Sequence, residues 1–216
     1  MYVLSDNFAA FREGFLSTVE LTALSALLAL VLGIVIAGFR VSPVPVLRAF
    51  GTTWVTLMVN TPLVLLFLAV TLGLPALGLK GWDSFWLAVM ALGAYTSAFV
   101  CEAVRSGINA VPVGQAEAAR SIGMTFTQTL GQIVLPQATR TAVPPIGSLL
   151  IALAKNTAVA SSFNVTELGS VMKTLNSAEG YNIFLVFFWI GLCYVVITFA
   201  ISGLFRLLES RLEVIR

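Results

Sequence analysis

The sequence of 216 residues contains no histidine, and this absence narrows the chemistry open to the chain. Histidine is the commonest haem and metal ligand and the usual general base, so haem, metal and acid–base sites are disfavoured. The sequence also lacks a G-x-x-x-x-G-K-[ST] phosphate loop, the usual site for ATP. We therefore expect no enzyme activity and no cofactor in this chain, and any driving energy must come from outside it.

Charged residues are scarce as well, at 10% of the chain against 58% hydrophobic residues. Soluble domains contain about 25% charged and about 45–50% apolar residues. Together with a mean hydropathy of +0.97, this composition predicts an integral membrane protein. The net charge of +2 is too small to indicate a nucleic-acid partner. Cys101 and Cys193 lie in apolar stretches and are expected to pack as small hydrophobic residues.

Five hydrophobic stretches approach the length of about 20 apolar residues that a spanning helix needs. They cover residues 15–39, 50–73, 85–104, 141–163 and 183–205. The first is too long for a signal-peptide core and has no basic segment before it. No repeat or linker divides the sequence, so we expect an all-α integral membrane protein with a single transmembrane domain over residues 1–216.

The distribution of Lys and Arg predicts the orientation of these spans. With the N-terminus outside, the inner segments hold eight basic residues: Arg40, Arg48, Arg105, Arg120, Arg140, Arg206, Arg211 and Arg216. The outer segments hold three: Arg12, Lys80 and Lys173. Because positively charged loops stay in the cytoplasm, we expect an outer N-terminus, a cytoplasmic C-terminus and a cytoplasmic loop over residues 105–140.

A polar, turn-rich stretch within this loop reads GQAEAARSIGMTFTQTLGQIVLPQ, residues 114–137. Good helix formers precede Gly123, which suits the left-handed position that ends a helix. Thr125 and Gln128 have the spacing of a capping box for a second helix, which Pro136 would end. That helix would form one apolar face from Phe126, Leu130, Ile133 and Val134. The pattern alone fits an amphipathic loop on the bilayer surface equally well.

The same stretch resembles the EAA loop of permease subunits in binding-protein-dependent ABC importers. The resemblance rests on Glu117, Ala118, Ala119, Gly123, Ile133, Leu135 and Pro136. Three more segments resemble the polar amino acid subgroup, the histidine, glutamine and glutamate type: NTPLVLLF at 60–67, YTSAFVCEAVRSGI at 95–108 and PPIGSLLIALAKNTAVAS at 144–161. The four segments occur in order and cover about half of the chain.

This resemblance implies a type I importer permease with five transmembrane helices and a cytoplasmic coupling helix that docks on an ATPase. The residues it assigns to ATPase coupling are Gln115, Glu117, Ala118, Ala119, Gly123, Leu135 and Pro136. The implied partners in a bacterial cell membrane are two ATPase subunits that bind ATP and Mg²⁺, a second permease that is a paralogue or an identical copy, and an extracytoplasmic solute-binding protein. The implied function is uptake of a polar amino acid, with glutamate favoured by the NTP, SGIN, GQAEAARS and LAKNT runs.

Polar residues within the spans are costly in lipid and therefore point to function. Pro62 removes a backbone hydrogen bond and disfavours helix at Thr61, so we expect a kinked or unwound backbone in the middle of the second span. A simple proline kink and a polar notch on a substrate path both fit. The importer family usually has Arg-Gly-Thr-Pro here, where this chain has Val59-Asn60-Thr61-Pro62.

Lys155 is the cation placed deep within a span, 14 residues after residue 141. This distance along a helix is roughly 20 Å from its inner end. The ammonium either extends to the membrane surface or lines a cavity, paired with a carboxylate of the protein or the substrate. The candidate residues of a substrate path are therefore Asn60, Thr61, Lys155, Asn156 and Thr157.

Two further patterns concern helix packing. Glu102 and Arg105 are three residues apart near the inner end of the third span and are expected to form a structural ion pair. Small residues at four-residue spacing in the first span allow close helix approach: Ser25, Ala29, Gly33 and Ala37. Packing within the chain is favoured for them, with a subunit interface as the alternative.

Two functions other than an importer permease fit a protein of this class. An ion-coupled secondary amino acid transporter would favour inverted repeats and intramembrane carboxylates. The second to fifth spans contain only Glu102, near an end, which argues against it. A structural subunit of a redox complex is disfavoured by the missing histidine. Co-purification of an ATPase would separate the importer from both alternatives.

The charge distribution gives a direct test of topology. A cysteine introduced at Gln128 should react with a membrane-impermeant thiol reagent only after the cells are lysed, because residues 114–137 are expected inside. The parent chain, with Cys101 and Cys193 alone, gives the background. Labelling of the Gln128→Cys protein in intact cells would invert the orientation.

Overall fold

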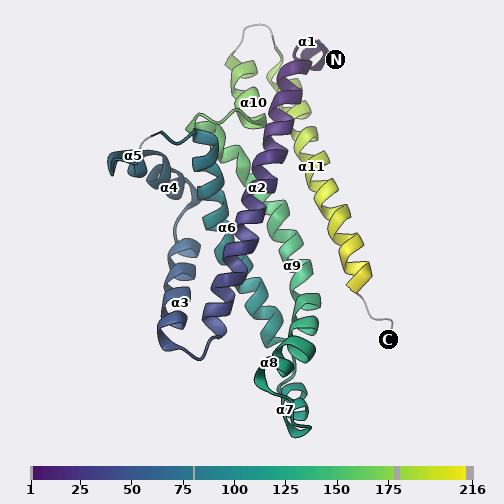
Figure 1. Ribbon diagram of the computed structural model, residues 1–216. Helices are drawn as coiled ribbons and strands as arrows, with labels where there is room; N and C mark the ends of the chain where they lie inside the picture. Colours follow the sequence, from purple (N-terminus) through teal and green to yellow (C-terminus); the bar gives the residue numbers. More distant parts are fainter. Residues whose placement is uncertain (1, 80, 178–180, 213–216) are drawn as a thin grey trace.

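The molecule is built around long helices that run along its length. The computed structural model describes residues 2–79, 81–177 and 181–212, and in these ranges it contains helices and turns but no strand. The long helices are α2 (Phe8–Val41), α6 (Ser84–Asn109), α9 (Leu135–Asn156) and α11 (Ile183–Leu212) (Figure 1). In the described chain, four helical segments are long and apolar enough to cross a membrane, with a fifth if a bent pair counts as one span. The all-α membrane fold predicted from composition is confirmed.

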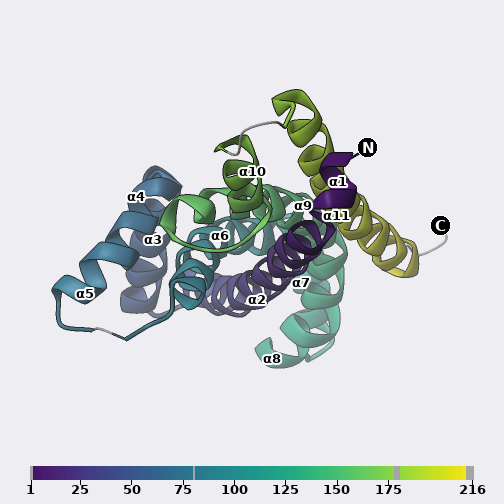
Figure 2. The ribbon, with the colours of Figure 1, turned by 90° about the horizontal axis from the view of Figure 1, so that it is seen from above.

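Shorter helices occupy both ends and one side of this bundle. They are α1 (Tyr2–Asp6), α3 (Pro45–Asn60), α4 (Leu63–Leu68), the π-helix η1 (Ala69–Gly73), α5 (Leu74–Ala76), α7 (Val113–Ser121), α8 (Phe126–Gln128), the π-helix η2 (Thr129–Val134), the 3₁₀ helix η3 (Thr157–Phe163) and α10 (Leu168–Ser177). Seen from above, α3 to α5 and α11 lie on opposite sides of the central helices (Figure 2).

Helices α2 and α6 pack closely through small residues. The stripe of Ser25, Ala29, Gly33 and Ala37 is buried. A Cβ added at Gly33 would lie 2.6 Å from the Val100 side chain and 2.8 Å from the Ser97 carbonyl oxygen of α6. In the reverse direction, a Cβ at Gly93 of α6 would lie 2.6 Å from Leu28. The small-residue stripe therefore packs within the chain, as the sequence favoured.

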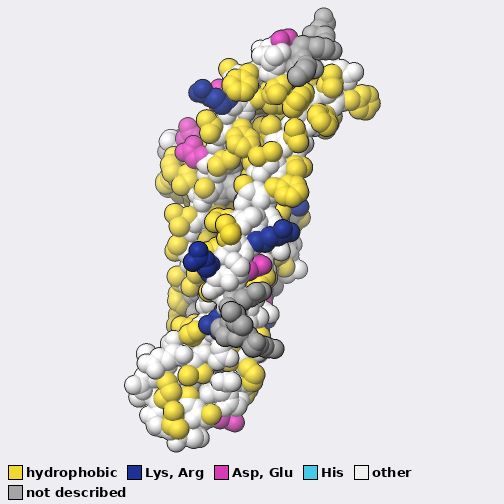
Figure 3. Space-filling view, turned by 90° about the vertical axis from the view of Figure 1, so that its right-hand side faces the viewer, with side chains coloured by type: hydrophobic (Ala, Val, Ile, Leu, Met, Phe, Trp, Pro, Cys, Tyr) yellow, Lys and Arg dark blue, Asp and Glu magenta, His cyan; other side chains and the backbone are white. Residues whose placement is uncertain are grey.

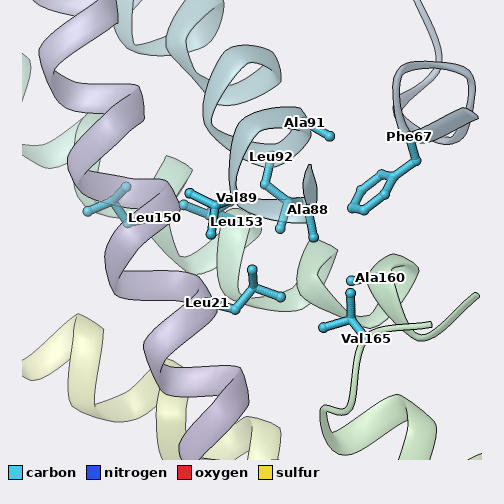
Figure 4. Close-up of a cluster of buried hydrophobic side chains, with 10 residues drawn as sticks. All are labelled: Leu21, Phe67, Ala88, Val89, Ala91, Leu92, Leu150, Leu153, Ala160 and Val165. Atoms are coloured by element: carbon cyan, nitrogen blue, oxygen red, sulfur yellow. The ribbon is translucent and has the colours of Figure 1, made fainter. Parts of the chain in front are cut away.

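The largest apolar cluster joins the three long helices α2, α6 and α9 to the short helix α4. Leu21 of α2, Leu92 of α6 and Leu153 of α9 are almost completely buried and point toward one another (Figure 4). Phe67 reaches this cluster from α4 and stacks on Phe163 of η3, with ring centroids 4.9 Å apart. This contact fixes α4 against the part of the bundle where α9 changes into η3.

The second predicted span, residues 50–73, is not one straight helix. Helix α3 starts at Pro45, ends at Asn60, and meets the α4–α5 arm at an angle of 108°. Thr61 has extended backbone angles of φ −100° and ψ 126°. The proline ring of Pro62 excludes the helical conformation of the preceding residue, so the break expected there is confirmed. Residues 50–73 therefore form one predicted span only if this bent pair of helices is counted as a single broken crossing.

The prediction that Pro136 ends a helix is wrong. The chain stays helical from Phe126 to Phe163, and Pro136 lies in the first turn of α9. The preceding π-helix η2 has the wider hydrogen-bond spacing, with the amide of Leu135 donating to the carbonyl of Leu130. The Gln137 side chain donates to the Ile133 carbonyl at 2.8 Å. A proline is tolerated at this point because the first turn of an α-helix does not need its N–H.

The tight approach at Gly33 predicts the effect of a larger residue. Gly33→Val should destabilise the protein by on the order of 1–3 kcal/mol, because the new side chain has to displace Val100 or the α6 backbone. The matched control is Gly38→Val on the same helix, where an added Cβ meets nothing within 4 Å. Thermal unfolding midpoints of the two purified variants measure the difference. Equal midpoints would contradict the packing described here.

Candidate functional site: the α7–α8 lobe and the polar residues of the spans

The segment expected to couple to a partner forms a separate lobe at one end of the molecule. Helices α7 and α8 lie beyond the long helices, at the end opposite the N-terminus (Figure 1). Gly123 separates them with a φ of +90°, the left-handed conformation predicted for it. The amide of Met124 donates to the carbonyl of Ala119 at 3.1 Å, which satisfies an orphan carbonyl at the end of α7.

The start of α8 is fixed by the predicted capping box. The Thr125 hydroxyl accepts from the amide of Gln128, and the Gln128 side chain accepts from the amide of Thr125 at 2.8 Å. These reciprocal bonds satisfy backbone groups at both ends of the turn. Gly123 and this box together fix the angle between α7 and α8, so the lobe is a defined structure and not a loose connection.

The lobe presents apolar side chains to its surroundings. Ala119 is buried, and helix α7 packs on η2. Gln115, Glu117 and Ala118 are exposed. Three large apolar side chains have high exposed fractions: Val113 at 73%, Ile122 at 80% and Phe126 at 67%. The apolar face predicted for the second helix is therefore divided, with Phe126 exposed while Leu130, Ile133 and Val134 are half-buried. An exposed apolar surface on a polar lobe is typical of a docking site.

The lobe is joined to the bundle by a short rigid base. Pro136 is exposed at the start of α9, and Leu135 lines an apolar cleft of about 190 Å³ together with Ile34 of α2 and Val104 of α6. Near this cleft, an added Cβ at Gly107 of α6 would lie 2.5 Å from the Ala138 carbonyl of α9. The backbones of α6 and α9 therefore lie in close contact at the base of the lobe.

An ion cluster links α2 to α6. Arg105 donates two hydrogen bonds to Glu102, at 2.8 Å and 3.0 Å, so these two residues lie together as the sequence anticipated. The other carboxylate oxygen of Glu102 accepts from Arg40 of α2. The sequence did not indicate the Arg40 contact, because Arg40 and Glu102 are 62 residues apart. The Glu102 carboxylate therefore bridges α2 and α6, and is not limited to an ion pair within α6.

The polar residues predicted for a substrate path lie on two separate segments. At the break, Asn60 donates to the Thr56 carbonyl and Thr61 donates to the Leu57 carbonyl, both at 2.7 Å, and Asn60 is exposed. In the other segment, Lys155 is exposed near the end of α9 and Thr157 is buried as the first residue of η3. Among the described residues, no hydrogen bond or ion pair joins the two segments, and none involves the Lys155 side chain, although its backbone carbonyl accepts from the Thr157 amide.

The sequence reasoning missed a buried acid, Glu167, between η3 and α10. Its carboxylate accepts from the Tyr194 hydroxyl at 2.7 Å and from the amide of Ser170 at 3.0 Å. Burial raises the pKa of Glu167, against the opposing effect of the hydrogen bonds from Gly169, Tyr194 and Ser170. One signal was available, since Glu167 and Ser170 have the spacing of a helix-capping pair before an apolar stretch.

Comparison with known proteins places this geometry in a family. Residues 29–214 match the family described as "binding-protein-dependent transport system inner membrane component". The chain is 41% identical over 205 residues to the glutamate transport system permease protein GluC of Corynebacterium efficiens, covering 89% of this chain and 90% of the relative. It is 36% identical over 211 residues to the probable glutamine ABC transporter permease protein GlnM of Bacillus subtilis, covering 98% and 97%.

Solved structures share the fold over nearly the whole chain. A chain in the crystal structure of an amino acid ABC transporter with histidines superposes with a TM-score of 0.89 at 30% identity, covering 97% of both chains. A chain in an inward-facing form of the MetNI methionine ABC transporter gives a TM-score of 0.80 at 18% identity, covering 96% of this chain and 98% of the other, a likeness of fold. The chain therefore belongs to the family of inner-membrane components of binding-protein-dependent transport systems.

Proposed function

We propose that this chain is the permease subunit of an ATP-driven importer for a polar amino acid, with glutamate as the favoured substrate. The observation that carries the proposal is the α7–α8 lobe, a fixed pair of short helices with exposed apolar side chains on a rigid base. The lobe has the sequence of an EAA loop. The similarity to glutamate and glutamine permeases over most of the chain supports the substrate class.

The partners follow from the family and from the surface of the lobe. Val113, Ile122 and Phe126 would dock in a groove of a cytoplasmic ATPase, which binds ATP and Mg²⁺ and carries out the hydrolysis. Two ATPase copies would face two permease subunits, and an extracytoplasmic solute-binding protein would deliver the amino acid. This chain makes and breaks no covalent bond in the cycle.

The orientation has the N-terminus outside and the C-terminus in the cytoplasm of a bacterial cell. The excess of basic residues in the inner segments supports this orientation. On the face shown in Figure 3, most Lys and Arg side chains lie in the half nearer the α7–α8 lobe. That half is also the one expected in the cytoplasm, where the lobe meets its ATPase.

Transport proceeds by alternating access. Closure of the ATPase dimer on ATP moves the lobe, and the touching backbones at Gly107 and Ala138 pass the motion to α6 and α9. The ion pair of Arg40 and Glu102 makes α2 move together with α6. ATP and substrate shift the inward and outward states only through their different affinities for them.

The substrate path would contain Lys155, with Asn60, Thr61, Asn156 and Thr157 as hydrogen-bonding neighbours. Lys155 is exposed in the single chain although it lies within the apolar helical segment Phe126–Phe163. A charge facing lipid is unfavourable by several kcal/mol, on the order of 3 kcal/mol at the centre of a helix. An aqueous cavity shared with a second permease removes that cost and offers a cation to the substrate carboxylate.

The coupling role predicts the effect of a substitution at Gly123. Gly123→Val should abolish uptake while the protein is inserted normally, because a β-branched residue resists the positive φ of +90°. The control is Gly131→Val in the same lobe, where φ is not positive and an added Cβ meets nothing within 4 Å. Uptake of labelled glutamate, normalised to membrane protein level, is the measurement. Normal uptake with Gly123→Val would contradict the coupling assignment.

The cavity role of Lys155 predicts a separate result. Lys155→Met should leave assembly of the complex intact and reduce substrate-stimulated ATP hydrolysis in reconstituted vesicles at least several-fold, because the carboxylate loses its cation. Lys173→Met, at an exposed lysine of α10, is the matched control. Loss of assembled complex would assign Lys155 to a structural pair between subunits. Unchanged assembly and unchanged transport would show that its ammonium extends to the membrane surface.

A further inference from the structure

The buried carboxylate of Glu167 lies where three helices and the end of α9 meet. Its side chain is completely buried, as are those of Thr18 on α2 and Thr157 at the start of η3. The Tyr194 hydroxyl of α11 donates to Glu167 and lies beside the hydroxyls of Thr18 and Thr157. This polar cluster thus touches α2, η3, α10 and α11, and one of its members follows Lys155 and Asn156 directly in the chain.

Hydrogen bonds fix the first turn of α10 to its neighbours. Glu167 and Ser170 form a reciprocal pair, in which the Ser170 amide donates to the carboxylate and the Glu167 amide donates to the Ser170 hydroxyl at 2.9 Å. The amide of Leu168 donates to the Thr18 hydroxyl of α2 at 3.1 Å. The amides at the start of α10, which no helical carbonyl can satisfy, are bound by Glu167 and by α2.

Two glycines bring the same turn into close contact with α2 and η3. A Cβ added at Gly14 of α2 would lie 2.7 Å from Val171 of α10. A Cβ added at Gly169 would lie 2.6 Å from the Glu167 carboxylate and 3.3 Å from the Ala158 carbonyl of η3. The first turn of α10 is thus packed tightly between α2 and η3, and α11 contacts it through Tyr194.

We propose that Glu167 is a positioning residue for the Lys155–Asn156 segment. The carboxylate, held by α10 and Tyr194, fixes the place where α9 becomes η3, between Asn156 and Thr157. A seven-residue 3₁₀ helix is long for this weaker geometry, so it depends on contacts of this kind. The inference deepens the proposed function and rests on it only for the claim that Lys155 faces the substrate.

The test measures the position of residue 155 without requiring transport. The reporter is Lys155→Cys in a chain with Cys101→Ala and Cys193→Ala, in the complex purified with its ATPase. The rate of reaction with a methanethiosulfonate reagent is measured in the parent background and with Glu167→Ala, Tyr194→Phe or Gly169→Ala. Gly169→Ala displaces the carboxylate without removing its charge.

Each of the three substitutions should change the labelling rate at Lys155→Cys at least three-fold. Tyr194→Phe combined with Glu167→Ala should do no more than the larger single change, because both remove the same contact. Glu20→Ala is the matched control, since Glu20 is an exposed acid on α2 and no side-chain hydrogen bond or ion pair of it is present in the described structure. A second reporter, Gln128→Cys in the α7–α8 lobe, is the control for distant effects. Its labelling rate should be the same in the parent and in each variant.

The conservative variant Glu167→Gln keeps the test decisive if Glu167→Ala does not assemble. It should assemble, shift the labelling rate less than removal of the whole carboxylate would, and lower uptake of labelled glutamate several-fold at normal membrane levels. An unchanged labelling rate in assembled Glu167→Gln, Tyr194→Phe and Gly169→Ala would overturn the proposal and leave Glu167 as an anchor of α10 alone. The proposal would also be overturned if the changes in labelling rate caused by Tyr194→Phe and Glu167→Ala multiplied in the double variant, because the two residues would then act independently.

The outcome is separable from that of the proposed function. If Lys155→Met transports normally while Glu167→Gln shifts the labelling rate, the substrate path is wrong and the positioning role stands. If Lys155→Met fails to respond to substrate while the labelling rate is unaffected by Glu167→Gln, the path stands and the positioning role is wrong.

Discussion

The close approach of α2 to α6 is the constraint on which the remaining structure depends. In lipid, apolar side chains gain little by leaving one apolar environment for another, so helices associate through backbone proximity and dispersion contacts. Gly33 and Gly93 each leave room for a side chain of the opposite helix, and a Cβ on either would overlap it. Once this pair is fixed, α9 packs against α6 through Gly107, and α11 packs against α9 through Gly147 and Phe205.

A second constraint acts wherever regular α-helix stops inside the molecule. Backbone groups away from water need a partner, and the chain satisfies them by local means. Thr61 and Asn60 bond to carbonyls one turn back at the Pro62 break. Gln137 does the same at the π-helical turn before α9. Glu167 and Thr18 satisfy amides at the start of α10. The polar residues at these points therefore serve the structure first, whereas the side chain of Lys155 makes no hydrogen bond or ion pair among the described residues.

Local patterns in the sequence were sufficient to predict the α7–α8 lobe and most spans. The capping box of Thr125 and Gln128 and the left-handed Gly123 are properties of a few adjacent residues, and both are present as predicted. The break at Pro62 was predictable for the same reason, since the proline ring restricts its own neighbour. The direction that α4 takes after the break was not, because the stacking of Phe67 on Phe163 joins residues nearly a hundred positions apart. The prediction of a helix end at Pro136 failed because the π-helix η2 precedes it. The wider turn of η2 depends on backbone hydrogen bonds that the preference of a single residue does not predict.

The sequence by itself determined that this is an all-helical membrane protein with a capped two-helix lobe, because hydropathy, proline, glycine and capping effects act over one or two helical turns. Only the tertiary structure decided that Arg40 shares Glu102 with Arg105, that the stripe of small residues packs inside the chain, and that Glu167 lies among Thr18, Thr157 and Tyr194. Arg40 lies 62 positions from Glu102, Tyr194 lies 27 positions from Glu167, and Thr18 accepts from an amide 150 positions away. These contacts form only when whole helices are packed, since each depends on the axial shift and rotation of one helix against another, which short-range preferences do not encode.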